Sequence, residues 1–227
     1  MWRLGDREKQ FIMTTDSRSV ILKRIKVGLR KPASYPESPL PTSPFPNIPP
    51  DDLVTRLERE LRALRADFFS ARNHEEAAAW IKQITDQHEL RRVVISPQAA
   101  SLGISSSISA HVLSGENDCG KNLADAELAI TGCDCLLAFT GSVVLTTHTG
   151  FGRALSVLPP AHLVVARRSQ VVANLYDAYR LLYTHYGRSW PSMITVITGP
   201  SRTADIEKII VLGAHGPKKL FILLLDF

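Results

Sequence analysis

A turn in the C-terminal part of the chain gathers residue types that could hold an anion. An alternating β-branched run over residues 194–198 stops at Gly199 and a proline, and Ser201, Arg202 and Thr203 follow. This order predicts a strand, a sharp turn and a helix capped by Ser201 or Thr203. The free backbone N–H groups and the dipole of a helix start favour a negative charge, and the planar guanidinium of Arg202 suits a carboxylate or phosphate. We therefore expect these four residues to bind a small anion.

The acids that follow this turn admit two interpretations. Asp205 and Glu207 lie two residues apart, so they do not share a face of a helix, and Asp205 is the better candidate for a general base beside Arg202. In the alternative interpretation Ser201 and Thr203 only cap the helix, while the acids pair with Arg202 or complement the helix dipole. The sequence leaves both open.

Two further candidates stand in glycine-containing loops. His215 lies in a Gly-Ala-His-Gly-Pro run before the last expected strand, so its ring could reach the same crevice as a catalytic group. Alternatively, it is a turn histidine bonded to a backbone carbonyl. Arg153 follows Gly150 and Gly152, whose lack of a side chain would let the backbone approach a ligand closely. This stretch matches neither the P-loop nor the dinucleotide-binding pattern, so it is equally well a flexible lid or a phosphate cradle.

The three cysteines do not form a recognisable metal site. Cys133 and Cys135 are separated by one residue, and Cys119 precedes them by fourteen positions. This spacing is neither the CxxC of zinc sites nor the four-ligand set of an iron–sulfur cluster. We expect no metal and no cofactor in this chain, and Cys135 is expected to be a buried strand residue. Three cysteines cannot all pair, and neither a membrane span of ~20 residues nor a secretory leader is evident, so the cytoplasm is the expected location.

Charge divides the chain into an arm and a body. The net charge is +5, but residues 1–31 hold nine Lys or Arg against three acids, giving +6, and residues 32–227 hold 18 against 19, giving −1. Residues 1–31 are expected to include a basic amphipathic helix, and residues 32–50, with eight of the 14 prolines, an extended linker. The body, residues 51–227, is nearly neutral, so nucleic acid is not expected as a partner.

Periodicity in the body predicts an α/β fold. Strands are expected at residues 67–71, 92–96, 135–139, 143–147, 162–166, 194–198 and 219–225, with 135–139 and 143–147 forming a hairpin or a bulged bend. Helices are expected after Asp52, Asn73 and Ser169 and over residues 124–131, the helix after Ser169 turning Val172, Leu175, Tyr179 and Leu182 inward. This alternation predicts a mostly parallel sheet flanked by helices. Ligands of such sheets bind at the carboxyl ends of the strands, where the Gly199 turn is expected to lie.

Three runs carry a resemblance to a known family. They are Thr-Gly-Pro-Ser-Arg-Thr-Ala-Asp-Ile-Glu at 198–207, Leu-Gly-Ala-His-Gly-Pro at 212–217 and Leu-Pro-Pro-Ala-His at 158–162. From about residue 51 onward the chain resembles the LUD-domain family. The resemblance implies a NagB/RpiA/CoA-transferase-like fold and a site role for His215. It also implies a lactate utilization component that works with two iron–sulfur partner proteins in oxidising L-lactate to pyruvate, with the clusters on those partners.

One departure from the family pattern bears on catalysis. Family members often carry an acid before the Thr-Gly-Ser bend at 140–142, where this chain has Phe139. CoA transferases of the wider fold use a glutamate as covalent nucleophile, which a phenylalanine cannot replace. The resemblance thus favours an accessory or binding subunit. The alternative is an autonomous enzyme acting on a sugar phosphate, carboxylate or acyl-CoA through Arg202, Asp205 and His215, and homo-oligomerisation stays open in both cases.

Overall fold

The computed structural model describes residues 15–29, 43–45, 48–104, 110–112, 123, 125–204, 210–212 and 216–227. It divides into two compact units, Met1–Thr42 and Ser43–Phe227. In the first unit, α1 (Thr15–Leu29) forms within the basic arm and exposes the apolar side chains of Ile21, Ile25 and Leu29. Most of the proline-rich linker lies outside the described residues. None of the described helices is long and apolar enough to cross a membrane.

The second unit is built on a six-stranded sheet in which every pairing is parallel. Its strands, in spatial order, are β1 (Asp67–Ala71), β12 (Lys219–Leu225), β7 (Ala161–Arg167), β4 (Leu128–Thr131), β2 (Val93–Ile95) and β3 (Ala110–Val112). The middle strands are continuous apolar runs, because a parallel sheet covered on both faces has no solvent side. The predicted α/β fold with a mostly parallel sheet is therefore confirmed.

One strand replaces a predicted helix. Residues 124–131 read as a short helix in the sequence, but Leu128–Thr131 form β4, paired with β2 and β7. All four of its side chains are buried. The alanines of this stretch are good helix formers, but intrinsic propensity is a small effect, and burial between two strands outweighs it.

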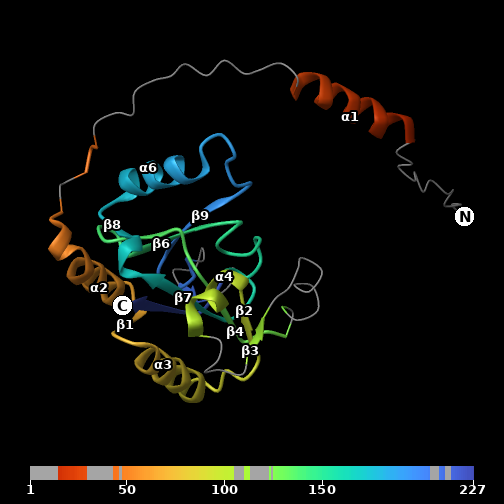
Figure 1. Ribbon diagram of the computed structural model, residues 1–227. Helices are drawn as coiled ribbons and strands as arrows, with labels where there is room; N and C mark the ends of the chain where they lie inside the picture. The colour runs from red at the N-terminus through yellow and green to blue at the C-terminus, as the bar shows by residue number, and fades with distance from the viewer. Residues whose placement is uncertain are drawn as a thin grey trace, which may run out of the picture. The chain divides into compact units, whose positions relative to one another are not determined.

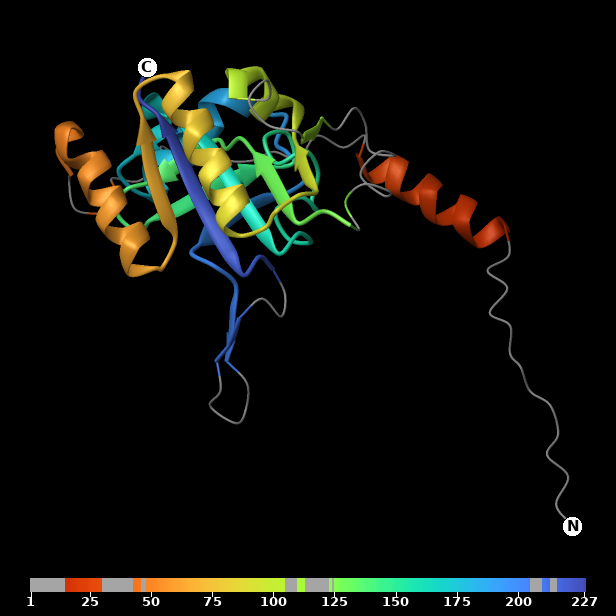
Figure 2. The same ribbon diagram turned by 90° about the horizontal axis from the view of Figure 1, so that it is seen from below.

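Helix α3 (His74–Gln87) packs on one face of the parallel sheet, and helix α2 (Leu53–Ala63) packs on the other. The two helices are visible on opposite sides of the sheet in Figure 2. As predicted, Asn73 caps α3, its side-chain oxygen accepting from the Glu76 N–H at 2.8 Å. The face of α2 buries Leu57 and Leu61 completely. Short helical turns complete the main layers: η1 (Pro50–Asp52), α4 (Pro97–Ala99) and η2 (Ala100–Ile104).

A second sheet of four strands lies on the same side of the first sheet as α2 (Figure 1). Its order is β8 (Val171–Val172), β5 (Cys135–Leu137), β6 (Ser142–Thr146) and β9 (Ile194–Thr198). Strands β5 and β6 form the predicted antiparallel hairpin. One face of this sheet, through Leu136, Val143 and Leu145, shares a core with the parallel sheet. The opposite face is covered by α6 (Leu175–Tyr186).

Helix α6 differs from its prediction in both start and orientation. Ser169 lies in a short turn, η4 (Arg168–Gln170), and the helix begins only after Asn174, whose side chain accepts from the Tyr176 and Asp177 N–H groups. The buried face also differs in part from the prediction. Ala178 and Leu182 face the core, whereas two residues expected inside, Leu175 and Tyr179, are 50% and 49% exposed.

Candidate functional site

Gly199 makes the turn after β9 because a side chain does not fit there. Its φ is +75°, and a Cβ would lie 3.1 Å from Leu64 Cβ and 3.3 Å from the Leu64 carbonyl oxygen. Glycine adopts this conformation without steric cost and leaves room for the close approach. After Pro200, the Ser201 N–H donates to the Pro217 carbonyl at 2.9 Å. The turn is thereby tied to the residues just before β12.

The prediction of a helix start after Gly199 is wrong. Arg202–Ala204 form a strand, β10, which pairs antiparallel with β11 (Ile210–Leu212) in a separate two-stranded hairpin. Figure 2 shows this hairpin extending away from the two main sheets. The Ser201 N–H is already bonded across the turn, and the β-branched residues of the hairpin favour a strand. The described residues after Gly199 therefore do not form the helix start whose N–H groups the expected anion site required, and the Ser201 N–H is already bonded.

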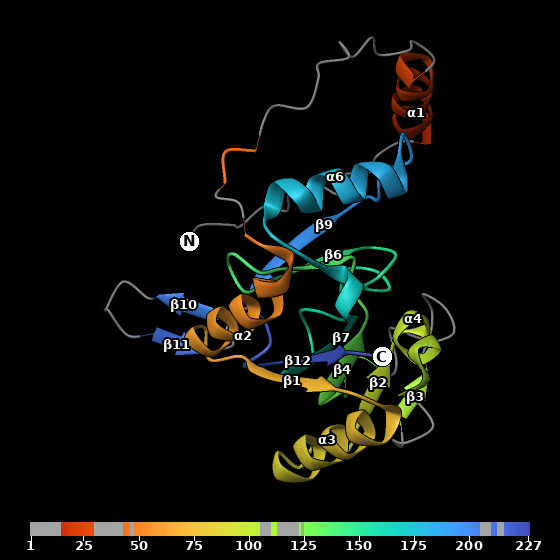
Figure 3. The same ribbon diagram turned by 60° about the vertical axis from the view of Figure 1, so that its left-hand side comes forward.

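The residues of this turn that were predicted to contact a ligand fall into two groups in the structure. Gly199 and Ser201 line a pocket beneath it. Arg202 is exposed, and its guanidinium donates to the carbonyl of Leu64, the C-cap residue of α2. Figure 3 shows the hairpin lying beside α2, as this contact requires. Thr203 is a ladder residue of β10, paired with Val211.

The other predicted residues are not brought to this pocket in the described part of the chain. Arg153 is exposed in the loop between β6 and β7 and is not among the described residues that line the pocket. Asp205 and His215, the two predicted catalytic residues, lie outside the described residues. Their roles stay predictions.

The pocket lies at the amino ends of the parallel strands, opposite to the prediction. His162 is the second residue of β7 and Leu220 the second of β12, and both line it. The prediction placed Gly199 at the carboxyl ends because it assumed that β9 belongs to the parallel sheet. Instead β9 pairs antiparallel with β6 in the second sheet, so the C-terminal end of β9 lies near the amino ends of the parallel strands.

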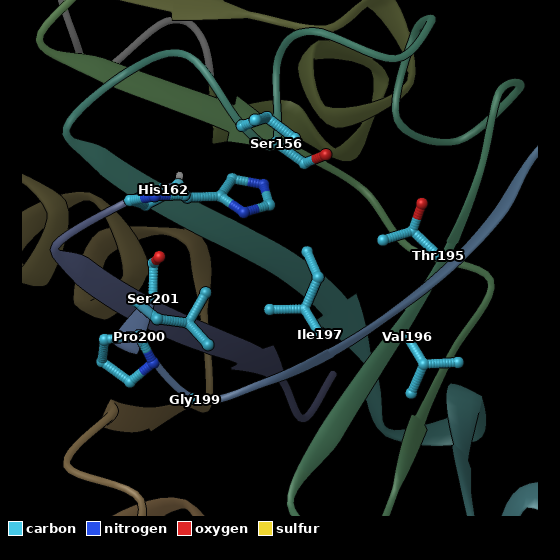
Figure 4. A pocket seen from close by; sticks show the side chains of 12 residues that line it. Ser156, His162, Thr195, Val196, Ile197, Gly199, Pro200 and Ser201 are labelled. Carbon is cyan, nitrogen blue, oxygen red and sulfur yellow. The ribbon is translucent and has the colours of Figure 1, made fainter. Parts of the chain in front are cut away.

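His162 is the most unusual polar side chain of the pocket. It is fully buried, and its Nε2 lies 2.8 Å from the Thr131 hydroxyl, while Nδ1 has no hydrogen-bond partner among the residues that the structure describes. Burial lowers its pKa to about 4, so the ring is neutral at pH 7. Leaving such a buried polar atom unpaired costs about 1–3 kcal/mol. Figure 4 shows the ring lying between Ser156 and Ser201 at the wall of the pocket.

The pocket itself is small and mostly apolar. Its volume is about 220 Å³, and its described lining is Ser156, Val157, His162, Thr195, Val196, Ile197, Gly199, Pro200, Ser201, Gly216, Pro217 and Leu220. Sequence reasoning did not single out His162 or Ser156 as site residues. The signal available for His162 was its place in the run 158–162. A histidine in an apolar strand is interpreted as a core residue, however, unless the position of the Gly199 turn beside it is known.

A second group of polar residues lies at the carboxyl end of β4. Asp134 is 7% exposed and accepts from the Tyr186 hydroxyl at 2.7 Å and from the Thr149 hydroxyl at 2.5 Å. The Tyr186 hydroxyl also lies 3.1 Å from the Thr146 hydroxyl. Burial and the bond to Asp134 raise the pKa of Tyr186 to about 12. These contacts join α6 to the loop after β6, and the hydroxyls satisfy the buried carboxylate.

The two described cysteines are poor metal ligands. Cys135 is buried in β5, as predicted, and Cys133 is buried just before it. Burial raises the pKa of Cys135 to about 12 and that of Cys133 well above its ordinary value, so both stay protonated thiols. Among the residues searched, the described ones, no three His, Cys, Asp or Glu side chains gather as a metal site. Cys119 lies outside them.

Phe139, the departure from the family pattern, sits in an aromatic and cationic environment. Its ring centroid lies 5.9 Å from that of Phe45 and 5.4 Å from the guanidinium carbon of Arg56. Arg56 and Arg59 both pair with the carboxylate of Glu60, at 2.9 and 3.1 Å. Phe139 is thus a packing residue that contacts Phe45, in the segment before α2.

Comparison with known proteins agrees with this architecture. Lactate utilization protein C of Shouchella clausii (strain KSM-K16) is 31% identical over 185 residues, covering 78% of this chain and 80% of that protein. Lactate utilization protein C of Geobacillus thermodenitrificans (strain NG80-2) is 29% identical over 77% of this chain and 79% of its own length. The Bacillus subtilis (strain 168) protein of the same name is 37% identical over 47% of this chain and 45% of itself.

A solved structure shares the fold. The crystal structure of a DUF162 family protein from Deinococcus radiodurans superposes with a TM-score of 0.61 at 20% identity, covering 79% of this chain and 99% of that one. A family model described as the LUD domain matches residues 54–225, which include both sheets and the pocket. The chain belongs to the LUD domain family.

Proposed function

We propose that this chain is the LUD-domain component of a lactate utilization system, acting with iron–sulfur partner proteins in the oxidation of L-lactate to pyruvate. The observation that carries the proposal is the extent of the likeness to proteins named Lactate utilization protein C. The two long matches cover 78% and 77% of this chain, which is more than a shared motif. The sequence runs at 158–162, 198–207 and 212–217 point to the same family.

We place the redox centres on the partner proteins. Cys133 and Cys135 are buried thiols with raised pKa values, and metal ligation requires an accessible thiolate. The structure describes both as free thiols rather than as a disulfide, which suits the reducing cytoplasm, where we place the system. The part of this chain is then binding and assembly rather than electron transfer.

The outer face of α6 supports an assembly role. Leu175, Tyr179 and Tyr183 follow one another at four-residue spacing and are 50%, 49% and 55% exposed. The Trp190 ring stacks on Tyr179 at 5.3 Å and lies 6.4 Å from Tyr183, which extends the apolar stripe. An exposed aromatic stripe of this kind is typical of a protein interface. We assign it to an iron–sulfur partner.

The alternative, an autonomous enzyme of the wider fold, gains no support from the described residues. Phe139 packs against Phe45 and cannot act as a covalent carboxylate. Arg202 is engaged with the end of α2.

Gene neighbourhood is the cheapest test, since adjacent genes for cysteine-rich iron–sulfur proteins favour the proposal. The decisive test co-expresses those proteins with this chain carrying an affinity tag. We expect them to co-purify and the complex to reduce a dye in the presence of L-lactate, with little activity when the chain is left out. Full lactate-dependent activity without the chain, or failure of the proteins to co-purify, contradicts the proposal.

A further inference from the structure

Strand β9 forms one edge of the second sheet and exposes apolar side chains there. Among the described strands it pairs with β6 alone, at the end of the strand order. Ile194 and Val196 are 39% and 45% exposed, and Thr198, the next residue on the same face, is exposed too. Val144, which lies opposite Val196 in β6, is by contrast buried under α6. The face that α6 covers therefore continues onto β9, where it is exposed.

The ladder with β6 identifies the backbone groups on the free side of β9. The Thr147 N–H donates to the Met193 carbonyl at 3.2 Å, so these two residues form a hydrogen-bonded pair. Bonded and non-bonded pairs alternate along an antiparallel ladder, so the odd-numbered residues of β9 direct their N–H and C=O groups to β6. The backbone groups of Ile194, Val196 and Thr198 then point to the free side. No backbone bond given for the described residues engages them.

The other described edge strands of the two main sheets have features that discourage pairing, and β9 lacks them. Strands β3 and β8 contain only three and two residues, and β1 begins with the charged Asp67. Natural proteins protect sheet edges with short strands, charges or prolines, because an open edge pairs with other chains. Strand β9 has five residues, Ile-Thr-Val-Ile-Thr, and none of them is charged or a proline. An unprotected edge of this kind is suited to pairing with another strand.

The composition of β9 suits a second copy of the same strand. If two β9 strands pair antiparallel about a two-fold axis at Val196, each Val196 faces its own copy, and Ile194 faces Thr198 of the other chain. All three residues direct their backbone groups outward, so each facing pair exchanges both of its hydrogen bonds. β-branched side chains pack well across such a ladder, and no like charges meet. A strand that recognised a charged segment would carry the opposite charge, and β9 carries none.

We propose that two copies of this chain associate through β9, which joins their second sheets into one continuous sheet. Each β9 has a single free side, so the contact closes on itself as a dimer. Pairing of one five-residue strand from each chain is a small interface, and small interfaces are weak, so we expect a dissociation constant on the order of micromolar. The pairing uses the edge of β9 and not the exposed stripe on α6. It therefore does not depend on the proposed role in lactate oxidation.

Sedimentation velocity of the full-length protein between about 1 and about 200 µM measures the association. We expect wild type to change from monomer to dimer across this range. Val196→Lys places like charges opposite each other at the axis and should weaken dimerisation by about tenfold or more. Val112→Lys is the matched control, because Val112 is 44% exposed on β3, the edge strand of the other sheet. It should leave dimerisation unchanged.

Amide hydrogen exchange, followed residue by residue by NMR at high protein concentration, identifies the strand involved. The N–H groups of Ile194 and Thr198 should be protected in wild type and in Val112→Lys, and should exchange rapidly in Val196→Lys. The N–H of Thr195 is bonded to β6 and should be protected in all three proteins, which shows that β9 is folded in each.

Several outcomes overturn the inference. One is a wild type that stays monomeric up to about 200 µM. Another is a dimer that Val196→Lys leaves intact, or one in which the N–H groups of Ile194 and Thr198 exchange rapidly, since it must use a different surface. Protection of these N–H groups only after an iron–sulfur partner protein is added would assign the edge to that partner.

A second variant keeps the test decisive if Val196→Lys disturbs β9 itself. Ile194→Lys changes a residue that is 39% exposed at the start of the strand, and it should weaken dimerisation in the same way. A dimer that this variant leaves intact, while Thr195 stays protected, contradicts pairing through β9. A complex that fails to oxidise lactate leaves these measurements interpretable, so the two proposals fail separately.

Discussion

At the scale of single residues, His162 couples pH to stability in a fixed direction. Burial lowers its folded pKa to about 4, from an ordinary value of 6.5. Between these two pH values the His162 ring is protonated in the unfolded chain but neutral in the folded chain. The free energy of unfolding therefore falls as pH drops from about 6.5 to about 4. A difference of this size corresponds to about 3 kcal/mol at the low end of the window.

We therefore expect His162→Phe to flatten the pH dependence of stability, whatever its effect at pH 7. Urea unfolding at pH 7, 5.5 and 4.5 measures this, with His185→Gln as the control because His185 is exposed on α6. Other groups also titrate in this range, so the informative quantity is the difference between wild type and variant. Parallel curves for wild type and His162→Phe would show that the ring is protonated in the folded state as easily as in the unfolded chain.

Arg202 has a structural role that the sequence did not reveal. Its guanidinium donates to the Leu64 carbonyl at the C-terminal end of α2, where a cation also interacts favourably with the helix dipole. We expect Arg202→Ala to reduce stability by about 0.3–1 kcal/mol, less at high salt. Arg202→Lys should recover part of this, since a lysine keeps the charge but not the planar fork.

Thermal melting of both variants at low and high salt checks the stability effect of Arg202. Calorimetric titration of the same proteins with lactate, pyruvate, phosphate and CoA tests the anion role predicted from the sequence. If wild type binds an anion and Arg202→Ala loses it, the guanidinium serves a ligand as well as α2. If stability is the same in all three proteins at low salt, the bond to Leu64 contributes nothing.

At the scale of elements, the sequence predicted what local patterns determine. The parallel strands β1, β2, β7 and β12, the β5–β6 hairpin and the Asn73 cap follow from apolar runs, bend residues and a capping side chain, each local in the chain. The errors arise where distant partners decide. The β10 strand depends on β11 and on the Pro217 carbonyl, and β4 depends on its neighbours β2 and β7.

The candidate site was predictable only in part, for the same reason. Gly199 and Ser201 were predicted as ligand contacts because a Gly-Pro-Ser turn has a local signature, and both line the pocket, while their role as ligand contacts stays a prediction. His162 was missed because its significance comes from a turn almost forty positions away in the chain. Nothing in the strand around His162 distinguishes a pocket histidine from a core histidine until β9 is placed in the second sheet.

The stripe on α6 gives a prediction at the element scale. Replacing Tyr179 and Tyr183 together by Ser should abolish co-purification with the iron–sulfur partners while the chain stays folded, because both rings are about half exposed. Loss of their contacts with Trp190 should cost about 1 kcal/mol, in the range for aromatic pairs. Arg180→Ser, an exposed change on the same helix, is the matched control. Undiminished co-purification of the double variant would place the interface elsewhere.

At the scale of the whole molecule, the boundary between arm and body can be tested by two truncations. Removal of residues 1–42 should leave a cooperative melting transition, because the compact body begins at Ser43. Removal of residues 1–50 also deletes Phe45, whose ring contacts Phe139. Losing that aromatic pair is expected to cost about 1 kcal/mol and to lower the Tm by about 2–4 °C in a domain of this size.

Differential scanning calorimetry of the two truncated proteins and of Phe45→Ala in the full chain measures this difference. The point variant should melt like the shorter protein. If the protein lacking residues 1–42 has no cooperative transition, the arm belongs to the core. If both truncations melt at the same temperature, the contact of Phe45 with Phe139 adds nothing to stability.

The place of β12 has a consequence for how the protein is made. This strand lies between β1 and β7, and Asp67 pairs with Phe221, about 150 positions later in the chain. At a synthesis rate of about 5–20 residues per second, β1 waits on the order of ten seconds for β12, its neighbour in the described sheet. Throughout that interval the nascent chain presents unpaired, apolar strand edges to the ribosome surface and to chaperones. Damage to β12 should therefore appear first as lost yield during translation, before any change in melting temperature can be measured.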